Sequence, residues 1–275
     1  MKNIQRSDLA CESYLLDDEQ NLKNGIKTTL HSISNYQAIE TEILNSYGES
    51  ITGKKQGKYL TLCLGKIWQH SEIELEKAVD LIAFSLKKLF SDANLKKRSF
   101  LVVGLGNKRI ISDALGPLTI EKMTPTAHLF ELDRSLFNKF GYSLSLFEPK
   151  VSAISGQDSS ELVLEISRLT KCACVILIDS LLSNSRLRLC KTVQVSNTGI
   201  VPGALRYIKK EITSELLALP VIAIGVPFAI AFESENELDK DEIFFSPYDV
   251  DIMVEKYSQI ISKGIEKAIS EFSNI

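Results

Sequence analysis

Three short and almost entirely apolar segments constrain the fold of this chain most strongly. They are FLVVGL (Phe100–Leu105), CVILID (Cys174–Asp179) and VIAIGV (Val221–Val226). Each has the length and β-branched content of a buried strand, and helical patterns such as Ser159–Thr170 lie between them. Strands without a polar face that alternate with helices predict a mostly parallel, twisted sheet with helices on both faces. The sequence therefore predicts an α/β fold.

Further elements are predicted around these strands. The other strand candidates are Ile26–His31, Tyr59–Leu64, Leu144–Ala153 and Thr192–Ser196. Ser71 and Glu74 have the spacing of a capping box at the start of a long amphipathic helix. A second helical pattern covers Lys209–Leu217, and Ser246 followed by Pro247 is typical of the start of a closing helix.

Length and composition favour one large unit with an extension. The chain has 275 residues, of which 44% are hydrophobic and 24% are charged, enough for one large core. We expect residues 1–275 to form a single domain. Within it, residues 66–275 are expected to be the α/β core, and residues 1–65 an N-terminal extension with a small β element.

Several classes of protein receive no support from the sequence. A net charge of −3 without a basic cluster argues against direct nucleic-acid binding, and no apolar run is long enough to span a membrane. Five cysteines without a C-x-x-C pair and three scattered histidines predict free thiols and no metal centre. The first residues, MKNIQRSDLA, lack the apolar core of a signal peptide, so a cytoplasmic location is expected.

The first candidate catalytic group follows the strand at Phe100. Gly104 and Gly106 permit a sharp turn where the strand ends, and Asp113 comes seven residues after Gly106. In open α/β sheets, ligands and reactive groups gather at this edge. A dinucleotide fingerprint would need a third glycine where this chain has Arg109, so we expect neither NAD nor another cofactor.

A second acid, Asp179, closes the CVILID strand. If both aspartates share a cleft, one carboxyl stays protonated near neutral pH while the other activates water, because close carboxylates do not both ionise readily. That arrangement suits acid–base hydrolysis of a peptide bond. The alternative is structural, since an aspartate at a strand end often only caps the next helix.

Ordered motifs along the chain resemble the germination protease family. These are VVGLGN and SDALGP (102–117), VSAISGQ (151–157), VILIDSLLS (175–183), TVQVSNTGIVPG (192–203) and PVIAIGVP (220–227). Outside the core, RSDLA (6–10) is similar to the segment near the family's mature amino terminus, and GKKQGKYLTL (53–62) to its early hairpin. The run SPYDVDIMVEKYSQII (246–261) resembles its closing helix.

The resemblance implies a core like that of the hydrogenase-maturation endopeptidases, with Asp113 and Asp179 as the catalytic pair. It implies a zymogen that loses a short propeptide, works as a homotetramer, and degrades small acid-soluble spore proteins in the spore core during germination. In such a site the turn at Gly106 and Asn107 would hold the substrate carbonyl, and Thr198 and Gly199 would line the cleft.

The chain departs from the family's pattern in its loops. Ser112 stands where the family has proline, Asn197 replaces an aspartate, and Val201 replaces a histidine. Two alternatives to the protease therefore stay open. One is a divergent relative that binds or regulates spore proteins without cutting them. The other is a metal-guided endopeptidase like the hydrogenase-maturation enzymes.

Overall fold

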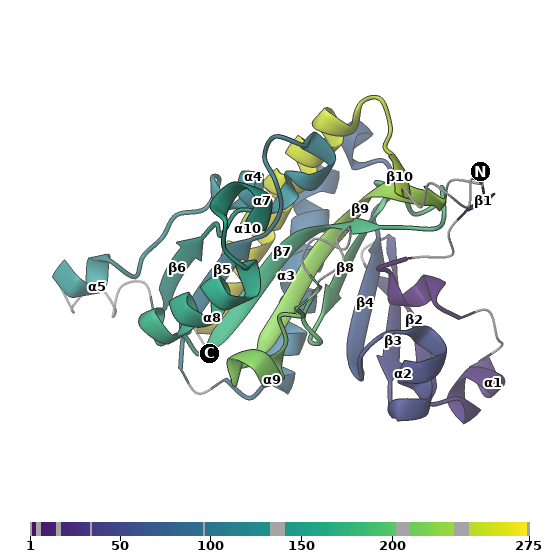
Figure 1. Cartoon of the computed structure of the whole chain (residues 1–275), viewed down its shortest axis with the longest axis horizontal. Helices are drawn as coiled ribbons and strands as arrows, with labels where there is room; N and C mark the ends of the chain where they lie inside the picture. The colour runs from purple at the N-terminus through teal and green to yellow at the C-terminus, as the bar shows by residue number, and fades with distance from the viewer. Residues whose placement is uncertain are drawn as a thin grey trace.

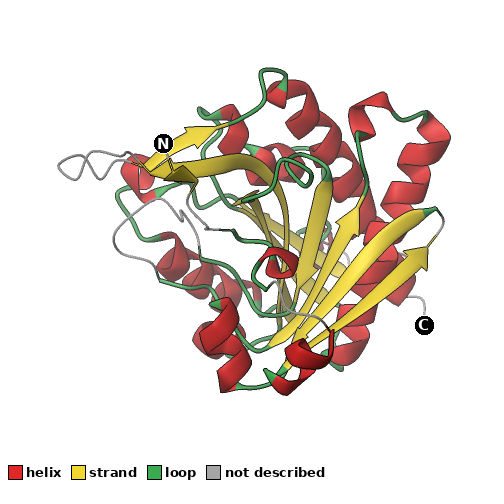
Figure 2. Ribbon diagram, turned by 90° about the vertical axis from the view of Figure 1, so that its right-hand side faces the viewer, coloured by secondary structure: helices red, strands yellow, loops and turns green. Residues whose placement is uncertain are grey.

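A large mixed sheet with helices on both faces forms the centre of the computed structural model (Figures 1 and 2). The structure describes residues 2–3, 7–14, 18–33, 35–95, 97–132, 141–201, 210–233 and 242–273. The strands are β1 (Lys2–Asn3), β2 (Ile26–Ile33), β3 (Tyr36–Ile43), β4 (Gly57–Cys63), β5 (Ser99–Gly104), β6 (Ser143–Phe147), β7 (Cys174–Leu182), β8 (Thr192–Ser196), β9 (Val221–Glu233) and β10 (Glu242–Phe245).

The helices connect and cover these strands. The α-helices are α1 (Asp18–Lys23), α2 (Ser46–Thr52), α3 (Glu72–Asp92), α4 (Leu115–Ile120), α5 (Leu129–Leu132), α7 (Ser152–Ser155), α8 (Ser159–Thr170), α9 (Ser214–Leu217) and α10 (Val250–Ser273). Three short 3₁₀ turns are η1 (Ala10–Glu12), η2 (Ile67–Gln69) and η3 (Ile111–Asp113).

The sheet consists of two halves that meet at β9. Its order is β2-β3-β4-β8-β9-β7-β5-β6, with β1 and β10 also paired to β9. Strands β6, β5, β7 and β9 run parallel to one another and form what we call the parallel half. Strands β2, β3, β4 and β8 form the antiparallel half, because β8 pairs antiparallel with β9 and each further strand is also antiparallel.

The predicted α/β class is confirmed, but the sheet is mixed rather than mostly parallel. Antiparallel pairing begins at β8, which follows β7 in the chain and lies alongside β9. Strands β2 to β4 come from the predicted N-terminal extension and continue the same sheet through the pairing of β4 with β8. The β element predicted in the extension is thus the outer part of the same sheet.

Two helical layers cover the sheet. Apolar side chains of α3 and α10 pack on one face against residues such as Val102 and Ile176. On the other face, Val163 of α8 and Leu217 of α9 pack against Leu101 and Leu177. Alternate residues of β5 and β7 thus enter different cores, which explains why both strands are apolar throughout. Figure 1 shows α8 and α9 on the opposite side of the sheet from α3 and α10.

The capping box predicted at Ser71 is confirmed. The Ser71 hydroxyl accepts a hydrogen bond from the Glu74 N–H (3.4 Å), and the Glu74 carboxylate accepts one from the Ser71 N–H (2.8 Å). These two bonds satisfy N–H groups that the start of a helix otherwise leaves without a partner. They set the first turn of α3, which covers one face of the sheet.

Several predicted boundaries were wrong. β6 ends at Phe147 rather than Ala153, because Pro149 offers no N–H to a ladder and Lys150 takes a positive φ of 61° before α7. β7 and β9 extend beyond their predicted ends, to Leu182 and Glu233. Helix α9 covers only Ser214–Leu217 of the second helical pattern, whose first residue lies outside the described ranges.

Candidate active site

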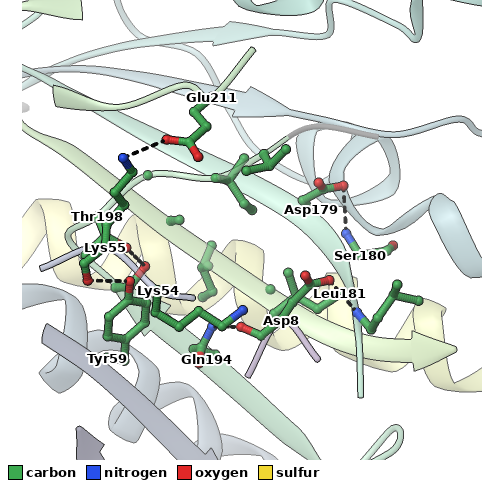
Figure 3. Close-up of a pocket in the computed structure, with 18 of the residues that line it drawn as sticks. Asp8, Lys54, Lys55, Tyr59, Asp179, Ser180, Leu181, Gln194, Thr198 and Glu211 are labelled. Carbon is green, nitrogen blue, oxygen red and sulfur yellow. Dashed lines mark hydrogen bonds and ion pairs between the residues drawn. The ribbon is translucent and has the colours of Figure 1, made fainter. Parts of the chain in front are cut away.

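One cavity brings the two predicted aspartates together. It has a volume of about 340 Å³ and lies where the parallel half meets the antiparallel half (Figure 3). Its polar and charged lining residues are Asp8, Lys54, Lys55, Tyr59, Ser112, Asp113, Asp179, Ser180, Gln194, Ser196, Thr198, Glu211 and Thr213. Its apolar lining includes Ile110, Leu181, Leu182, Ile200, Val201, Ile224, Ala229 and Phe244. We call it the central cavity.

Asp113 enters the cavity from the last residue of η3. Its carbonyl accepts a hydrogen bond from the Asn107 N–H (2.9 Å), which closes the turn after β5. Gly106 has a φ of 116°, and a Cβ there would lie 2.1 Å from the Asp113 carbonyl oxygen and 3.2 Å from its Oδ1. Only glycine therefore lets the turn close against Asp113.

A second glycine seats the helix that follows Asp113. A Cβ on Gly116 would lie 2.2 Å from the Leu105 carbonyl oxygen and 2.7 Å from that of Ile178. These are main-chain atoms of the turn after β5 and of β7, so they offer little room to move. Without a side chain at this position, α4 rests directly on the parallel half and holds η3 at the mouth of the cavity.

Asp179 lies within β7, immediately after the last residue that pairs with β5. The pairing ends at Gly104 and Ile178, so β5 turns away and leaves the Asp179 side chain beside the cavity. Asp179 is only 6% exposed, and its carboxylate accepts a hydrogen bond from the Ser180 N–H (2.9 Å). The strand thus places a buried acid at an edge left open by its neighbour.

Both acids have raised pKa values. Burial raises the pKa of Asp113 to about 6, and a main-chain hydrogen bond from Asn107 opposes this only in part. Burial also raises the pKa of Asp179 well above its ordinary value, and the nearby charges of Asp113 and Asp8 add to the effect. The electrostatic influence of Asp113 on Asp179 indicates that the two carboxyls form a coupled pair.

The supporting residues predicted from the sequence fall into two groups. Thr198 and Gly199 line the central cavity, where Gly199 has a φ of 85° that suits a turn. Gly106 and Asn107 are not among the lining residues. They belong to the turn that packs against the main chain of Asp113, where the Asn107 N–H bonds the Asp113 carbonyl. The Asn107 side chain accepts a hydrogen bond from the Arg109 N–H (3.0 Å), so it stabilises its own turn.

The departures from the family pattern have different places in the structure. Ser112 and Val201 line the cavity, so both substitutions change its wall. Asn197 lies outside the lining and joins two strands of the antiparallel half. Its Oδ1 accepts from the Lys58 N–H (2.8 Å), and its own N–H donates to the Lys58 carbonyl (3.2 Å).

The sequence did not reveal a third carboxylate, Asp8. Its Oδ2 accepts from the Leu182 N–H (2.7 Å), and its own N–H donates to the Leu182 carbonyl (2.9 Å). Gln194 of β8 donates to the Asp8 carbonyl (3.0 Å). The segment RSDLA carries a family resemblance, but nothing local in it signals a contact with residues far along the chain.

The cavity wall that faces Asp179 carries two lysines, each with a polar partner. The Lys54 ammonium donates to the Ser7 carbonyl (2.6 Å), and Lys55 lies 3.5 Å from the carboxylate of Glu211. The Tyr59 hydroxyl donates to the Lys55 carbonyl (2.9 Å), which holds the turn before β4 against the cavity. Figure 3 shows Lys54, Lys55 and Tyr59 across the cavity from Asp179 and Ser180.

Two further features bear on the class of protein. Among the described residues, no three His, Cys, Asp or Glu side chains come together as a metal-binding group. The helices in the described ranges are all too short or too polar to cross a membrane. Fold and site together define an α/β protein whose central cavity holds a pair of carboxylic acids, one buried and one half-buried.

Comparison with known proteins identifies the family. The family model described as germination protease matches residues 4–236, so the chain belongs to the germination protease family. It is 35% identical over 234 residues to the germination protease of Bacillus pumilus, which covers 82% of this chain and 63% of that protein. It is 28% identical over 312 residues to that of Clostridium acetobutylicum, covering 97% of this chain and 95% of that protein.

This chain thus spans less than two thirds of the length of the Bacillus pumilus relative. Among solved structures, it is similar to the [NiFe] hydrogenase maturation protease HycI from Thermococcus kodakarensis. That match has a TM-score of 0.39 and 15% sequence identity, and it covers 66% of this chain and 98% of that one.

Proposed function

We propose that this protein is an endopeptidase in which Asp113 and Asp179 together activate water. The observation that carries the proposal is the pair itself: two acids from different segments line one cavity, and the charge of half-buried Asp113 raises the pKa of buried Asp179. The membership of the chain in the germination protease family supports the same activity.

The pKa values indicate which aspartate acts as the base and which as the acid. Asp113, with a pKa of about 6, is largely ionised at neutral pH and serves as the base, whereas Asp179, whose pKa burial and the charge of Asp113 raise well above its ordinary value, serves as the acid. Asp113 removes a proton from water as the water oxygen bonds to the scissile carbonyl carbon, and Asp179 protonates the carbonyl oxygen. When the C–N bond breaks, Asp113 passes its proton to the amine, and Asp179 takes one back from a hydroxyl of the intermediate.

The natural substrates proposed are small acid-soluble spore proteins, degraded in the spore core during germination. The homologues named germination protease support a role in germination, and the resemblance to the family described above implies the substrate. We also propose, from the same resemblance, a homotetramer and a zymogen with a short propeptide. The second candidate function is binding of spore proteins without cleavage, which the altered cavity wall at Ser112 and Val201 favours.

The test is cleavage of a purified small acid-soluble spore protein by the full chain, with and without a metal chelator. We expect cleavage that the chelator does not affect, and a loss of about 10²–10⁴-fold in kcat for Asp113→Asn and for Asp179→Asn. Asp80→Asn is the matched control, because this exposed aspartate of α3 pairs only with Lys267 in the described structure and should leave cleavage unchanged.

Three outcomes separate the candidates. Full activity in either active-site variant would rule out the two-acid mechanism. Cleavage that the chelator abolishes would identify a metal-guided endopeptidase instead. Binding of the spore protein without cleavage across the pH range would support the binding function.

A further inference from the structure

Gln194 holds the main chain of residues 8–10 with both ends of its side-chain amide. Its Nε2 donates to the Asp8 carbonyl (3.0 Å), and its Oε1 accepts from the Ala10 N–H (2.7 Å). These are the carbonyl and the N–H on either side of Leu9, the two groups that a neighbouring strand would bond. Leu9 has an extended backbone (φ −79°, ψ 123°) just before η1, so the amide recognises a main chain that is extended at this residue, whatever side chains that chain carries.

A second set of main-chain contacts comes from β7. Beyond the pairing of Ile178 with Gly104, the edge of β7 that faced β5 is open to another partner. At Leu182 this edge bonds Asp8 in both directions, through an N–H to the Asp8 carboxylate (2.7 Å) and a carbonyl to the Asp8 N–H (2.9 Å). Alternate residues of a strand present their polar groups to the same edge, so Ser180 lies on this edge too.

This edge passes the candidate catalytic acid. The Ser180 N–H donates to the Asp179 carboxylate (2.9 Å), so that carboxylate is directed along the same edge that holds Asp8 at Leu182. Figure 3 shows Asp8 between Gln194 and the end of β7, with Asp179 and Ser180 further along the strand. A chain bound in this way lies on the same edge of β7 as Asp179.

The side chains of the held segment also fit their surroundings. Leu9 and Ala10 are both 0% exposed, and the Asp8 carboxylate has a main-chain N–H as its partner. An acidic residue, a large aliphatic residue and a small residue in succession are thus fully accommodated. Each polar group of this contact has a hydrogen-bond partner, as expected of a binding site rather than a chance contact.

We propose that Gln194 and the Leu182 main chain form a subsite for the main chain of a peptide that is extended at its central residue, which residues 8–10 of the same chain, with Leu9 extended, occupy here. The inference rests on the proposed function, because the peptide it describes is the substrate of that site. The chain's own segment and a peptide added in solution then compete for one subsite, and Gln194 is a positioning residue for both.

The test measures binding in the full chain, with Asp113→Asn in every sample so that turnover does not interfere. The probe is an acetylated and amidated peptide of residues 7–12 that carries Cys11→Ser. Ala10→Pro releases the internal segment, since proline has no N–H for the Gln194 oxygen. Faster amide hydrogen exchange in residues 7–12 reports that release.

We expect the peptide to bind the Ala10→Pro protein at least about tenfold more tightly than its parent, because an attached segment competes at roughly millimolar effective concentration. Adding Gln194→Met to Ala10→Pro should weaken binding about tenfold or more through the loss of two hydrogen bonds. Gln194→Glu keeps the acceptor but loses the donor, so its effect should be intermediate.

Two controls isolate the main-chain contact. A peptide methylated on the alanine nitrogen should bind no better to the Ala10→Pro protein than to its parent. Gln37→Met, which alters an exposed glutamine of β3, should leave binding unchanged. Equal binding to the parent and the Ala10→Pro protein, or unchanged binding after Gln194→Met, would overturn the proposal. Because binding is measured without turnover, these results do not depend on whether the wild-type protein cleaves spore proteins.

Discussion

The two halves of the sheet contribute differently to the central cavity. The parallel half supplies Asp113 and Asp179, whose burial exceeds the compensation from their hydrogen bonds, so their pKa values are raised. The antiparallel half supplies Gln194 and Tyr59, whose polar atoms bond main-chain groups at 2.7–3.0 Å. Acids whose burial is only partly offset by hydrogen bonds have shifted pKa values, which suits proton transfer. Polar groups with complete hydrogen bonding are rigid, which suits binding a chain in a fixed position.

The largest effect on stability is expected where α4 rests on the parallel half. Gly116→Ala places a Cβ within 2.2–2.7 Å of main-chain atoms of Leu105 and Ile178, which do not relax easily. We expect a loss of about 3–5 kcal/mol in the free energy of unfolding, measured by urea denaturation.

Gly53→Ala is the matched control for this substitution. Gly53 has a φ of 65°, but a Cβ at this position would meet no other atom within 4 Å, so only backbone strain applies. A cost of about 1 kcal/mol is expected there. Equal costs at the two positions would show that the close contact of α4 with the strands is not what requires Gly116.

The second effect concerns the cost of ionising Asp113. Its pKa rises from 3.8 in the unfolded chain to about 6 in the fold, so the folded state favours the protonated acid. The resulting loss of stability is absent at low pH, grows as pH rises from about 4 to about 6, and is complete above that range. Asp113→Asn should therefore stabilise the protein by about 2 kcal/mol at pH 7.5 and far less at pH 4.5.

Urea denaturation of wild type and variant at both pH values measures this difference. A stabilisation of the same size at the two pH values would mean that ionisation is not its cause. Asp80→Asn serves again as the control. It removes only an exposed ion pair with Lys267, so it should not stabilise the protein more at pH 7.5 than at pH 4.5.

The smallest effect is expected in the antiparallel half. Tyr59→Phe removes the hydrogen bond from the Tyr59 hydroxyl to the Lys55 carbonyl (2.9 Å) and leaves the buried ring in place. We expect a loss of about 1 kcal/mol in the free energy of unfolding and no change in the pH dependence of cleavage. A shifted pH dependence would contradict the assignment of proton transfer to the parallel half alone.

The same two halves differ in how far their structure could be predicted from the sequence. In the parallel half, apolar runs predicted β5 and β7. The glycine turn after the first run indicated Asp113, and the last residue of the second run is Asp179 itself. In the antiparallel half, β3 was not predicted, because its polar sequence YQAIETEI is only half-buried and carries little apolar signal. Gln194 and Asp8 are 186 residues apart, and no local sequence pattern predicts a contact over that separation.

The most direct test of the account is a titration of the two carboxyl groups. Carbon-13 NMR of labelled aspartate follows each carboxyl through pH, with Asp113→Asn and Asp179→Asn assigning the signals. The account predicts that Asp113 titrates near pH 6 and that Asp179 titrates at a higher pH than an ordinary aspartate. It also predicts that Asp113→Asn lowers the pKa of Asp179, because a neighbouring negative charge is removed. Two independent titrations near the ordinary aspartate value of about 3.9 would contradict the proposed catalytic pair.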